Sequence, residues 1–447
     1  MQLTYPDIAL QVPRVLLPGA GIAPEHWSVI ACDQYTSEPE YWREVEKLVG
    51  DAPSTLNLVF PEVYLEEADR GARITAINRQ MRTYLDERLL VEQAAGFVLV
   101  DRQTRHAKSR KGLIASLDLE QYSFADGASS LIRPTEGTDP ARLPPRVEVR
   151  REAMLELPHT MVLIDDPTHS VLEPLFDRRN QLPVLYDFEL MMGGGHLRGW
   201  HVNDPDSINQ VVVNLSRLIS DPKDTNNQGA TSPMLYAMGD GNHSFATAQR
   251  VWEEVKEQAG STPIEHPARH VLVELVNIHD QGLTFEPIHR VVFDTDAERL
   301  LASFSAHCQS QGSQLQVREI YDEQQWARAL DGGDDNSSQE LPFITGHRRG
   351  VCTIHRPRQQ LAVATLQGFF SDCEHVEEHH RVDYIHGRDA VGELGSRPGN
   401  LGFYTRSIDK HTLFDTIRAD GPLPRKSFSM GEAEEKRYYL ESRRIRP

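Results

Sequence analysis

The chain carries the residues GDGNHS at positions 239–244, which bring together most of the side-chain types that catalysis uses. A carboxylate, an amide, an imidazole and a hydroxyl follow one another here, and the two glycines permit backbone conformations that other residues avoid. An apolar run, Leu235 to Met238, precedes this stretch, and a helical pattern follows it at once. The sequence therefore predicts a strand, a glycine-rich loop and a helix in succession.

Two interpretations of this loop are open. Asp240 could act as a general base or reach a metal ion, and His243 could donate a proton or contact a phosphate. Main-chain N–H groups at the start of a helix bind anions, and the helix dipole favours them. The alternative is a structural turn in which His243 bonds to the backbone. The stretch is neither a P-loop nor a dinucleotide-binding fingerprint. The candidate residues are Gly239, Asp240, Gly241, Asn242, His243 and Ser244.

Other apolar runs also end in a carboxylate. Asp33, Asp101, Asp165 and Asp166 each follow such a run. Because ligands of α/β sheets sit beyond the carboxyl ends of strands, these acids could share a crevice with Asp240. There they could hold Mg²⁺ together with a phosphate compound. The alternative is that they form ordinary turns, in which aspartate is frequent.

Basic residues offer further anion-binding candidates, none of them diagnostic. Arg133 lies in an irregular segment that could clamp an anion or could be a plain loop. A basic cluster at 102–111 is interpreted as a solvated hairpin tip. No HExxH or comparable spacing of ligands appears, so no zinc site is predicted. Besides the loop, the candidate ligand-binding residues are Arg133, His289, Arg290, Arg425 and Lys426.

The composition is that of a globular protein and limits the possible partners. The formal net charge is −19, so general nucleic-acid binding, which relies on Lys and Arg, is not expected. No run of eighteen apolar residues and no secretory signal are visible. The four cysteines are widely spaced, which favours a reduced, cytoplasmic setting. The sequence gives no indication of the oligomeric state.

The element pattern predicts a mixed α/β or α+β protein with two regions. Strand-like and helix-like segments alternate over 1–296, including a helix over 65–94, which indicates a larger α/β region that carries the loop. Residues 297–447 indicate a smaller α+β region. There, Phe343 to Ile354 and Leu361 to Leu366 are predicted to form a meander of strands.

Several motifs together resemble an uncharacterised bacterial and archaeal family, domain of unknown function 1015. They are MGDGNHSFATAQ, WSVIACDQYTSEPEYWREVE, PSTLNLVFPEVYL, VLVELVNIHDQGLTFEPIHRVVF and GPLPRKSFSMGEAEEKRYYLE. The resemblance spans nearly the whole chain. Members of the family are often labelled ParB-like, which implies a ParB- or sulfiredoxin-like element around the central loop. Relatives of that fold include kinases of free serine.

The resemblance also implies which loop residues matter. Asp240 and Gly241 match the family's Asp-Gly-His-His-Arg element, and His243 matches its second histidine. Asn242 replaces the first histidine, and Ser244 replaces the arginine. Because a serine hydroxyl cannot replace a bidentate guanidinium, a phosphate would need another basic partner. Arg133, Arg290 and Arg425 are the candidates for that role.

Three functions follow as hypotheses. The first is a cytoplasmic enzyme that acts on a phosphorylated small molecule, either a nucleotide-dependent phosphotransferase or a phosphate-compound hydrolase, with Mg²⁺ brought by the nucleotide. The second is a non-catalytic sensor that binds a nucleotide or metabolite at the same loop. The third is a ParB-like DNA-associated regulator, which the acidic net charge argues against.

Overall fold

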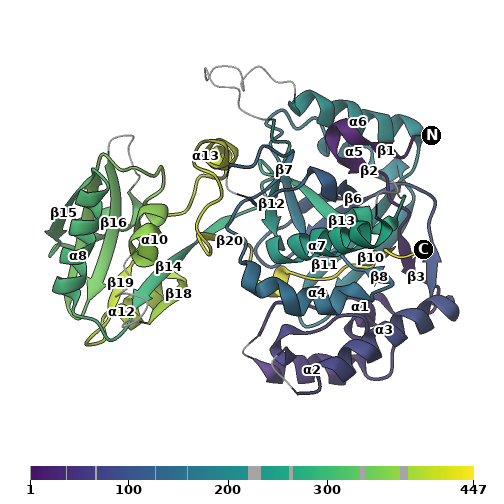
Figure 1. Ribbon diagram of the computed structural model, residues 1–447, viewed down its shortest axis with the longest axis horizontal. Helices are drawn as coiled ribbons and strands as arrows, with labels where there is room; N and C mark the ends of the chain where they lie inside the picture. The colour runs from purple at the N-terminus through teal and green to yellow at the C-terminus, as the bar shows by residue number, and fades with distance from the viewer. Residues whose placement is uncertain are drawn as a thin grey trace. The chain divides into compact units, whose positions relative to one another are not determined.

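The computed structural model describes residues 2–36, 38–65, 68–125, 127–158, 160–219, 233–260, 265–332, 338–372 and 381–447 (Figure 1). The chain forms two compact units. The first comprises Met1–Thr284 and Gly431–Pro447, and the second comprises Phe285–Met430. This differs from the predicted division after residue 296. The boundary falls earlier because strand β14 (Phe285–Val292) already pairs within the second unit, and the C-terminal residues return to the first.

The first unit is built on a mixed sheet, to which the described residues contribute ten strands. Helices of very different length accompany it. Among the described residues, no helix is both long and apolar enough to cross a bilayer. The main path of the sheet is β10 (Val184–Leu190), β11 (Gly195–Val202), β5 (Phe97–Gln103), β6 (Arg110–Asp118), β13 (His270–Asn277), β9 (Met161–Ile164), β12 (Tyr236–Asp240) and β7 (Ile132–Pro134), with β1 (Thr4–Tyr5) and β2 (Leu10–Gln11) beside β6. The helices are α1 (Pro24–Trp27), α2 (Pro39–Val49), α3 (Arg70–Asp86), α4 (Leu143–Arg151), α5 (Glu173–Asp177), α6 (Pro205–Ile219) and α7 (Asn242–Ala259).

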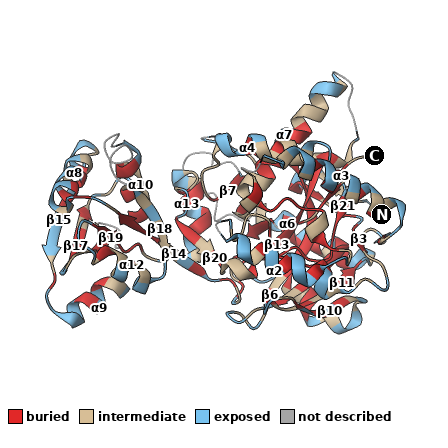
Figure 2. Cartoon of the chain, turned by 90° about the horizontal axis from the view of Figure 1, so that it is seen from below, coloured by how far each residue is buried: buried red, intermediate tan, exposed pale blue. Residues whose placement is uncertain are grey.

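Each face of this sheet packs against its own apolar core. Along β5, Phe97 and Leu99 lie in one core, whereas Val98 and Val100 lie in the other, as the two-residue period of a strand requires. Helices α6 and α7 contribute their buried faces to the first core, and α3 contributes to the second. Buried residues therefore run along the strands, while the outer faces of the helices are exposed (Figure 2). The predicted mixed α/β fold is confirmed.

Strand direction decides which loops meet in this sheet. β13 is parallel to β9 and antiparallel to β6, and β6 is antiparallel to β5. β5, β9 and β13 therefore all run one way. β12 is antiparallel to β9 and parallel to β7, so these two strands run the other way. The carboxyl ends of β12 and β7 meet at one edge of the sheet, and those of β5 and β9 lie at the opposite edge.

Two predicted elements differ from the structure. The helix predicted over 65–94 is the shorter α3, which is followed by a strand, β4 (Leu90–Glu92), after a reversal at Arg88 with φ of 57°. The run from 361 to 366, predicted as a strand, opens helix α10 (Ala362–Asp372) instead. Its buried side chains recur at the helical spacing of four residues, at Ala362, Leu366 and Phe370.

The second unit is a smaller α+β unit with an antiparallel sheet. Of the meander predicted from Phe343 to Leu366, the first part is present as the antiparallel pair β16 and β17. The strand path is β15 (Gln314–Glu319), β17 (Arg348–His355), β16 (Ser338–Thr345), β19 (Leu401–Phe403), β14 and β18 (Val382–His386), and β20 (Phe428–Met430) also pairs with β14. The helices are α8 (Ala297–Ser310), α9 (Glu323–Asp331), α10, α12 (Arg388–Gly395) and α13 (Leu413–Asp420).

The last residues of the chain, 431–447, form an extended C-terminal segment in the first unit. Isolated bridges pair Arg437 with Ile30 and Ser442 with Leu16. Strand β21 (Arg443–Arg444) then pairs with β8 (Leu155–Glu156). Much of this segment is polar and nevertheless buried, so its polar groups need partners inside the protein.

Glu441, in the C-terminal segment, makes stability depend on pH. Its side chain is fully buried and accepts a hydrogen bond from the Tyr186 hydroxyl at 2.7 Å. Burial raises the pKa of this carboxyl to about 7 from its ordinary value of 4.5. The stability that a raised pKa confers is present below the unfolded pKa and is lost as the pH rises through the folded pKa. We expect the unfolding free energy to fall by about 2 kcal/mol between pH 5.5 and pH 8 because of this group.

Urea unfolding at the two pH values measures this effect. In Glu441→Gln the neutral amide no longer titrates, so this component of the pH dependence should disappear. An equal change in unfolding free energy between pH 5.5 and pH 8 in the wild type and the variant would contradict the assignment.

Candidate functional site

The glycine-rich loop connects β12 to α7, as the sequence predicted. Gly239 lies at an irregularity in the pairing of β12 with β9, between the pairs that Met238 and Asp240 make. Gly241 is the residue before the helix and has a φ of 80° and a ψ of 27°, in the left-handed region. A side chain at Gly241 would also meet Thr160, whose Oγ1 lies 2.8 Å from the ideal Cβ position. Both its backbone angles and this close approach require glycine at position 241.

Replacing Gly241 by alanine should lower stability by about 2 kcal/mol, since a left-handed backbone and a steric overlap are both introduced. Urea unfolding measures the loss. Gly193→Ala is the matched control, because Gly193 also has a positive φ, of 66°, but has no neighbour within 4 Å of the added Cβ. Equal losses in the two variants would show that the contact with Thr160 adds nothing.

Asp240 is held by a hydrogen bond and an ion pair. Its Oδ1 accepts the N–H of Gly241 at 2.9 Å, and its Oδ2 lies 2.9 Å from Nζ of Lys436. Burial alone would lower the pKa of the Lys436 ammonium, but Asp240, Asp33 and Glu136 outweigh it and raise this pKa. We call Asp33, Glu136, Asp240 and Lys436 the acidic–lysine cluster.

Topology explains how this cluster forms. β7 and β12 are parallel and in register, with Pro134 opposite Met238. Glu136 and Asp240 each follow these partners by two residues, so both lie beyond the same edge of the sheet. The hydroxyl of Thr135 donates to the carbonyl of Met238 at 2.5 Å and ties the two strand ends together. Lys436 comes from the C-terminal segment, whose main chain bonds to Ala31 two residues before Asp33.

His243 bonds to the segment that follows β7. Its Nε2 accepts the main-chain N–H of Asp139 at 3.3 Å. A ring nitrogen that accepts carries no proton, so this contact requires the proton of a neutral His243 to be on Nδ1. The contact matches the structural interpretation of His243, and it also fixes the loop next to the acidic–lysine cluster.

Asn242 and Ser244 lie in the first turn of α7. Asn242 Oδ1 is buried, and no hydrogen-bond partner for it is found in the described part of the chain. Ser244 lines a cavity of about 140 Å³ in the first unit together with Thr247. Arg133, on β7, is buried and its Nε donates to the carbonyl of Ser130 at 3.0 Å.

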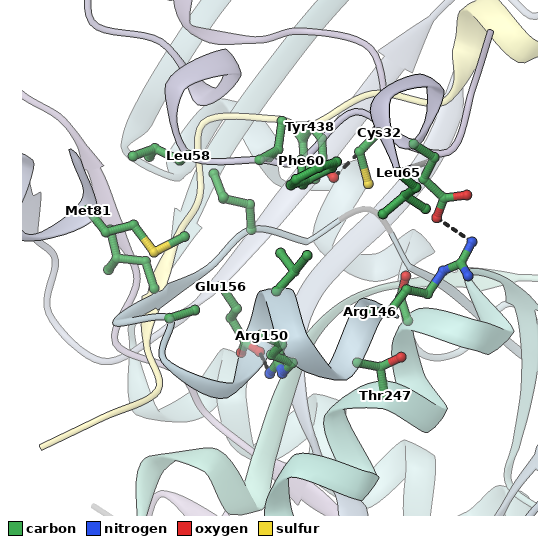
Figure 3. A pocket seen from close by; sticks show the side chains of 17 residues that line it. Cys32, Leu58, Phe60, Leu65, Met81, Arg146, Arg150, Glu156, Thr247 and Tyr438 are labelled. Carbon is green, nitrogen blue, oxygen red and sulfur yellow. Dashed lines mark hydrogen bonds and ion pairs between the residues drawn. The ribbon is translucent and has the colours of Figure 1, made fainter. Parts of the chain in front are cut away.

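Figure 3 shows the side chains that line this cavity, among them Cys32, Tyr438 and Thr247. Cys32 and Tyr438, which line it, are close in sequence to Asp33 and Lys436. Burial raises the pKa of Glu62, another lining residue, and Asp33 adds to that shift, although the guanidinium of Arg146 opposes it. Glu62 and Arg146 form an ion pair. Asp33 therefore acts electrostatically on Lys436 in the cluster and on Glu62 in the cavity wall.

Four predicted ligand residues belong to the second unit, whereas the loop belongs to the first. Arg290 is fully buried on β14, and its guanidinium donates to the carbonyl of Arg425 at 3.4 Å. The Arg290 guanidinium and the Lys426 ammonium both face the ring of Tyr384. Burial lowers the pKa of His289 to about 4, so its ring is neutral, and Nδ1 accepts the N–H of Thr405 at 3.1 Å.

The expectation that all strand-end carboxylates share one crevice is wrong for Asp101, Asp165 and Asp166. β5 and β9 run against β12, so these acids lie at the opposite edge of the sheet from Asp240. Each also has a local partner: Asp101 accepts from Ser109, Asp165 pairs with His279, and Asp166 accepts the main-chain N–H groups of residues 170 and 171. Asp33 and Asp240, by contrast, do act on the same ammonium.

The basic cluster at 102–111 does lie on the β5–β6 hairpin, but it is only partly solvated. Arg102 is fully buried and donates to the carbonyls of Gln103 and Gly194, each at 2.6 Å. Arg110 is buried beside Glu274, at 3.2 Å. The Nη groups of both guanidiniums bond to buried partners, which favours a structural role for these two arginines.

The basic residue beside Asp240, Lys436, is not among the candidates that the sequence patterns indicate. It lies in GEAEEKRYYLE, part of a motif that resembles the family, and nothing in that motif's sequence connects it to the loop. Glu136 lies beside the predicted residue Arg133 and was likewise not singled out. Among the described residues, no three His, Cys, Asp or Glu side chains are arranged to hold a metal ion.

The fold and this site define a mixed α/β protein with a strand, a glycine-rich loop and a helix at the edge of its larger sheet. The family described as "Protein of unknown function (DUF1015)" matches residues 16–368. The chain belongs to this family. No curated protein matches it.

Several solved structures resemble the chain at low sequence identity. A conserved hypothetical protein from Pyrococcus furiosus has 9% identity and a TM-score of 0.37, over 74% of this chain and 95% of that one. Free serine kinase in complex with AMP has 8% identity and a TM-score of 0.38, over 74% and 91%. SbnI from Staphylococcus aureus, truncated at its C-terminus, has 8% identity and a TM-score of 0.35, over 71% and 82%. Similarity at this level transfers no ligand or activity to this chain, and the ParB-like label is not confirmed.

Proposed function

We propose that the protein is an enzyme acting on a phosphorylated small molecule, and specifically a nucleotide-dependent phosphotransferase that works at the loop of residues 239–244. The observation that carries the proposal is the Asp240–Lys436 pair. A carboxylate and an ammonium lie 2.9 Å apart directly before the amino end of an 18-residue helix. General-base chemistry and binding of an anion are thus available at one place.

In the proposed transfer, a hydroxyl of the acceptor attacks the terminal phosphorus of a nucleotide polyphosphate. The hydroxyl proton passes to the carboxylate of Asp240 as the new oxygen–phosphorus bond forms. The bond from that phosphorus to the bridging oxygen breaks, and the shortened nucleotide leaves with the electron pair. The ammonium of Lys436 stabilises negative charge on the transferring group. With water in place of the acceptor, the same step is a hydrolysis.

The start of α7 supports binding of the phosphate. Gly241 precedes the helix and offers no capping side chain, and no acidic residue lies in the first turn. The positive end of the helix dipole is therefore not neutralised by the helix itself. Lys436 provides a cation near this point, where Ser244 replaces the arginine of the family motif.

Magnesium fits this site only as part of a nucleotide complex. No set of three protein ligands is found among the described residues. Mg²⁺ is commonly held by one or two carboxylates together with phosphate oxygens and water. Asp33 and Glu136 are the carboxylates that would supply such a contact, and the ion would screen the phosphates from the acidic–lysine cluster.

A thermal-shift panel of nucleotides and phosphorylated metabolites, with and without Mg²⁺, tests the proposal. A ligand that binds the folded protein raises the melting temperature by mass action. At least one nucleotide should do so in the wild type, and Asp240→Asn and His243→Ala should respond less. If no compound shifts the wild type, or if both variants respond as the wild type does, the proposal fails.

A non-catalytic nucleotide sensor is the second candidate, and the bond from Asp139 to His243 favours it. A ring that holds two segments together is placed for structure rather than for proton transfer. Steady-state and single-turnover assays with a nucleotide found by the panel separate the two candidates. Binding without any turnover would establish the sensor.

A further inference from the structure

The cavity beside the loop has walls that are mainly apolar. Leu58, Phe60 and Val149 represent this lining, which comes from segments packed around α3 and α4. Ser244 and Thr247 add hydroxyls from one face of α7, since residues three apart on a helix are neighbours. The Thr247 hydroxyl already donates to the carbonyl of His243 at 2.7 Å, so toward the cavity it can only accept.

The charged groups of the lining are already paired. Glu62 pairs with Arg146, and Glu156 pairs with Arg150 (Figure 3). A charged group that entered the cavity would lose its hydration and would have to compete with these pairs. The lining is therefore suited to an uncharged molecular fragment.

Size limits that fragment further. The cavity volume of about 140 Å³ is close to the ~150 Å³ of an apolar protein cavity that accepts benzene. About six carbon atoms therefore fill it. Ser244 lines this space from the first turn of α7, four residues after Asp240.

We infer that this cavity is the acceptor pocket of the enzyme and takes the short, uncharged aliphatic body of a small molecule. The polar end of the molecule, a hydroxyl before transfer and a phosphate ester after it, faces Asp240 and Lys436. The inference rests on the proposed function, because the pocket can bind an acceptor only if the acidic–lysine cluster binds the phosphate that is transferred to it. It narrows the substrate class to small aliphatic alcohols and their monophosphates.

Calorimetric titration with n-alkyl phosphates, from methyl to octyl, in the presence of Mg²⁺ tests the inference. Inorganic phosphate is titrated alongside. The dissociation constant should fall about fourfold for each added methylene, up to about six carbons, and then stop falling. Lys436→Met should weaken the binding of every member of the series.

Two variants should change the alkyl chain length beyond which the affinity no longer increases. Val149→Ala enlarges the pocket and should move the limit to a longer chain, and Ala153→Leu should move it to a shorter one. Val147→Ala is the matched control: Val147 lies on the same helix but packs in the other core, so the limit should stay where it is. If Ala153→Leu does not fold, Val149→Ala decides.

The titrations distinguish a failure of the pocket inference from a failure of the proposed function. If inorganic phosphate binds but the affinity ignores chain length, the pocket inference is overturned and the proposed function stands. If the gain with chain length is the same in the wild type and Val149→Ala, the chain lies elsewhere and the inference is also overturned. If neither phosphate nor any alkyl phosphate binds, the proposed function is wrong, and the pocket inference that depends on it is wrong as well.

Discussion

Asp240→Asn is expected to lower the rate of phosphoryl transfer by about 10²–10⁴-fold, the range that a positioned general base contributes. The amide keeps the size of the side chain but does not accept a proton at neutral pH. Lys436 keeps the charges of Asp33 and Glu136 around it, so the cluster should stay folded. Initial rates with a Mg²⁺–nucleotide and an acceptor measure the change, and the loss should appear in kcat more than in the KM for the nucleotide.

Asp165→Asn is the control for this result. Asp165 also follows a strand of the same sheet and is also paired with a cation-forming side chain, His279, at 2.7 Å. It lies at the opposite edge of the sheet, so its replacement should leave the rate within about twofold. A rate in Asp240→Asn that equals that of the wild type would remove Asp240 from the chemistry.

The loop could be predicted from sequence because all of its determinants are local. An apolar run, two glycines and a helical pattern follow one another without a gap, and the structure has β12, Gly241 and α7 there. The β5–β6 hairpin was predictable for the same reason. Hydrophobic periodicity distinguishes a helix from a strand only over a long enough window. The six residues 361–366 are too few, and the four-residue spacing of the buried side chains becomes clear only when Phe370 is included.

The remainder of the site depends on information that apolar runs do not carry. A run shows that a strand exists but not how the strand runs relative to its neighbours. That direction decides that Glu136 lies at the same edge of the sheet as Asp240, whereas Asp165 lies at the opposite edge. Lys436 reaches the loop because a polar C-terminal segment is buried in the first unit. Charge-rich tails are usually exposed, so burial of this one could not be expected from composition.

A buried ion pair helps to hold that segment in place, and breaking it should be costly. Arg443 is 6% exposed and Glu156 is 5% exposed. The Nε of Arg443 donates to Glu156 at 2.8 Å, and its Nη1 donates to the carbonyl of Pro267 at 3.0 Å. Although burial raises the pKa of Glu156, Arg443 and Arg150 outweigh it, and the pKa is lowered. The carboxylate is therefore charged inside the protein.

Arg443→Met is expected to lower the unfolding free energy by about 3–4 kcal/mol, because it leaves part of that buried charge without compensation. Urea unfolding of the full chain measures the loss. Arg444→Met is the matched control: it is the next residue and makes the same change of side chain, but Arg444 is exposed and should cost no more than about 0.5 kcal/mol. Similar losses in the two variants would show that the pair with Glu156 does not anchor the segment.

The same variant links stability to the proposed site. Lys436 and Arg443 belong to one extended segment, so loosening its end should also reduce the time that Lys436 spends beside Asp240. Below the melting transition, Arg443→Met should therefore bind a nucleotide from the panel more weakly than Arg444→Met does. Equal nucleotide affinities in the two folded variants would mean that the local contacts of Lys436, with the acidic–lysine cluster and with Ala31, are enough to hold it, and that the anchor at Glu156 serves only the fold.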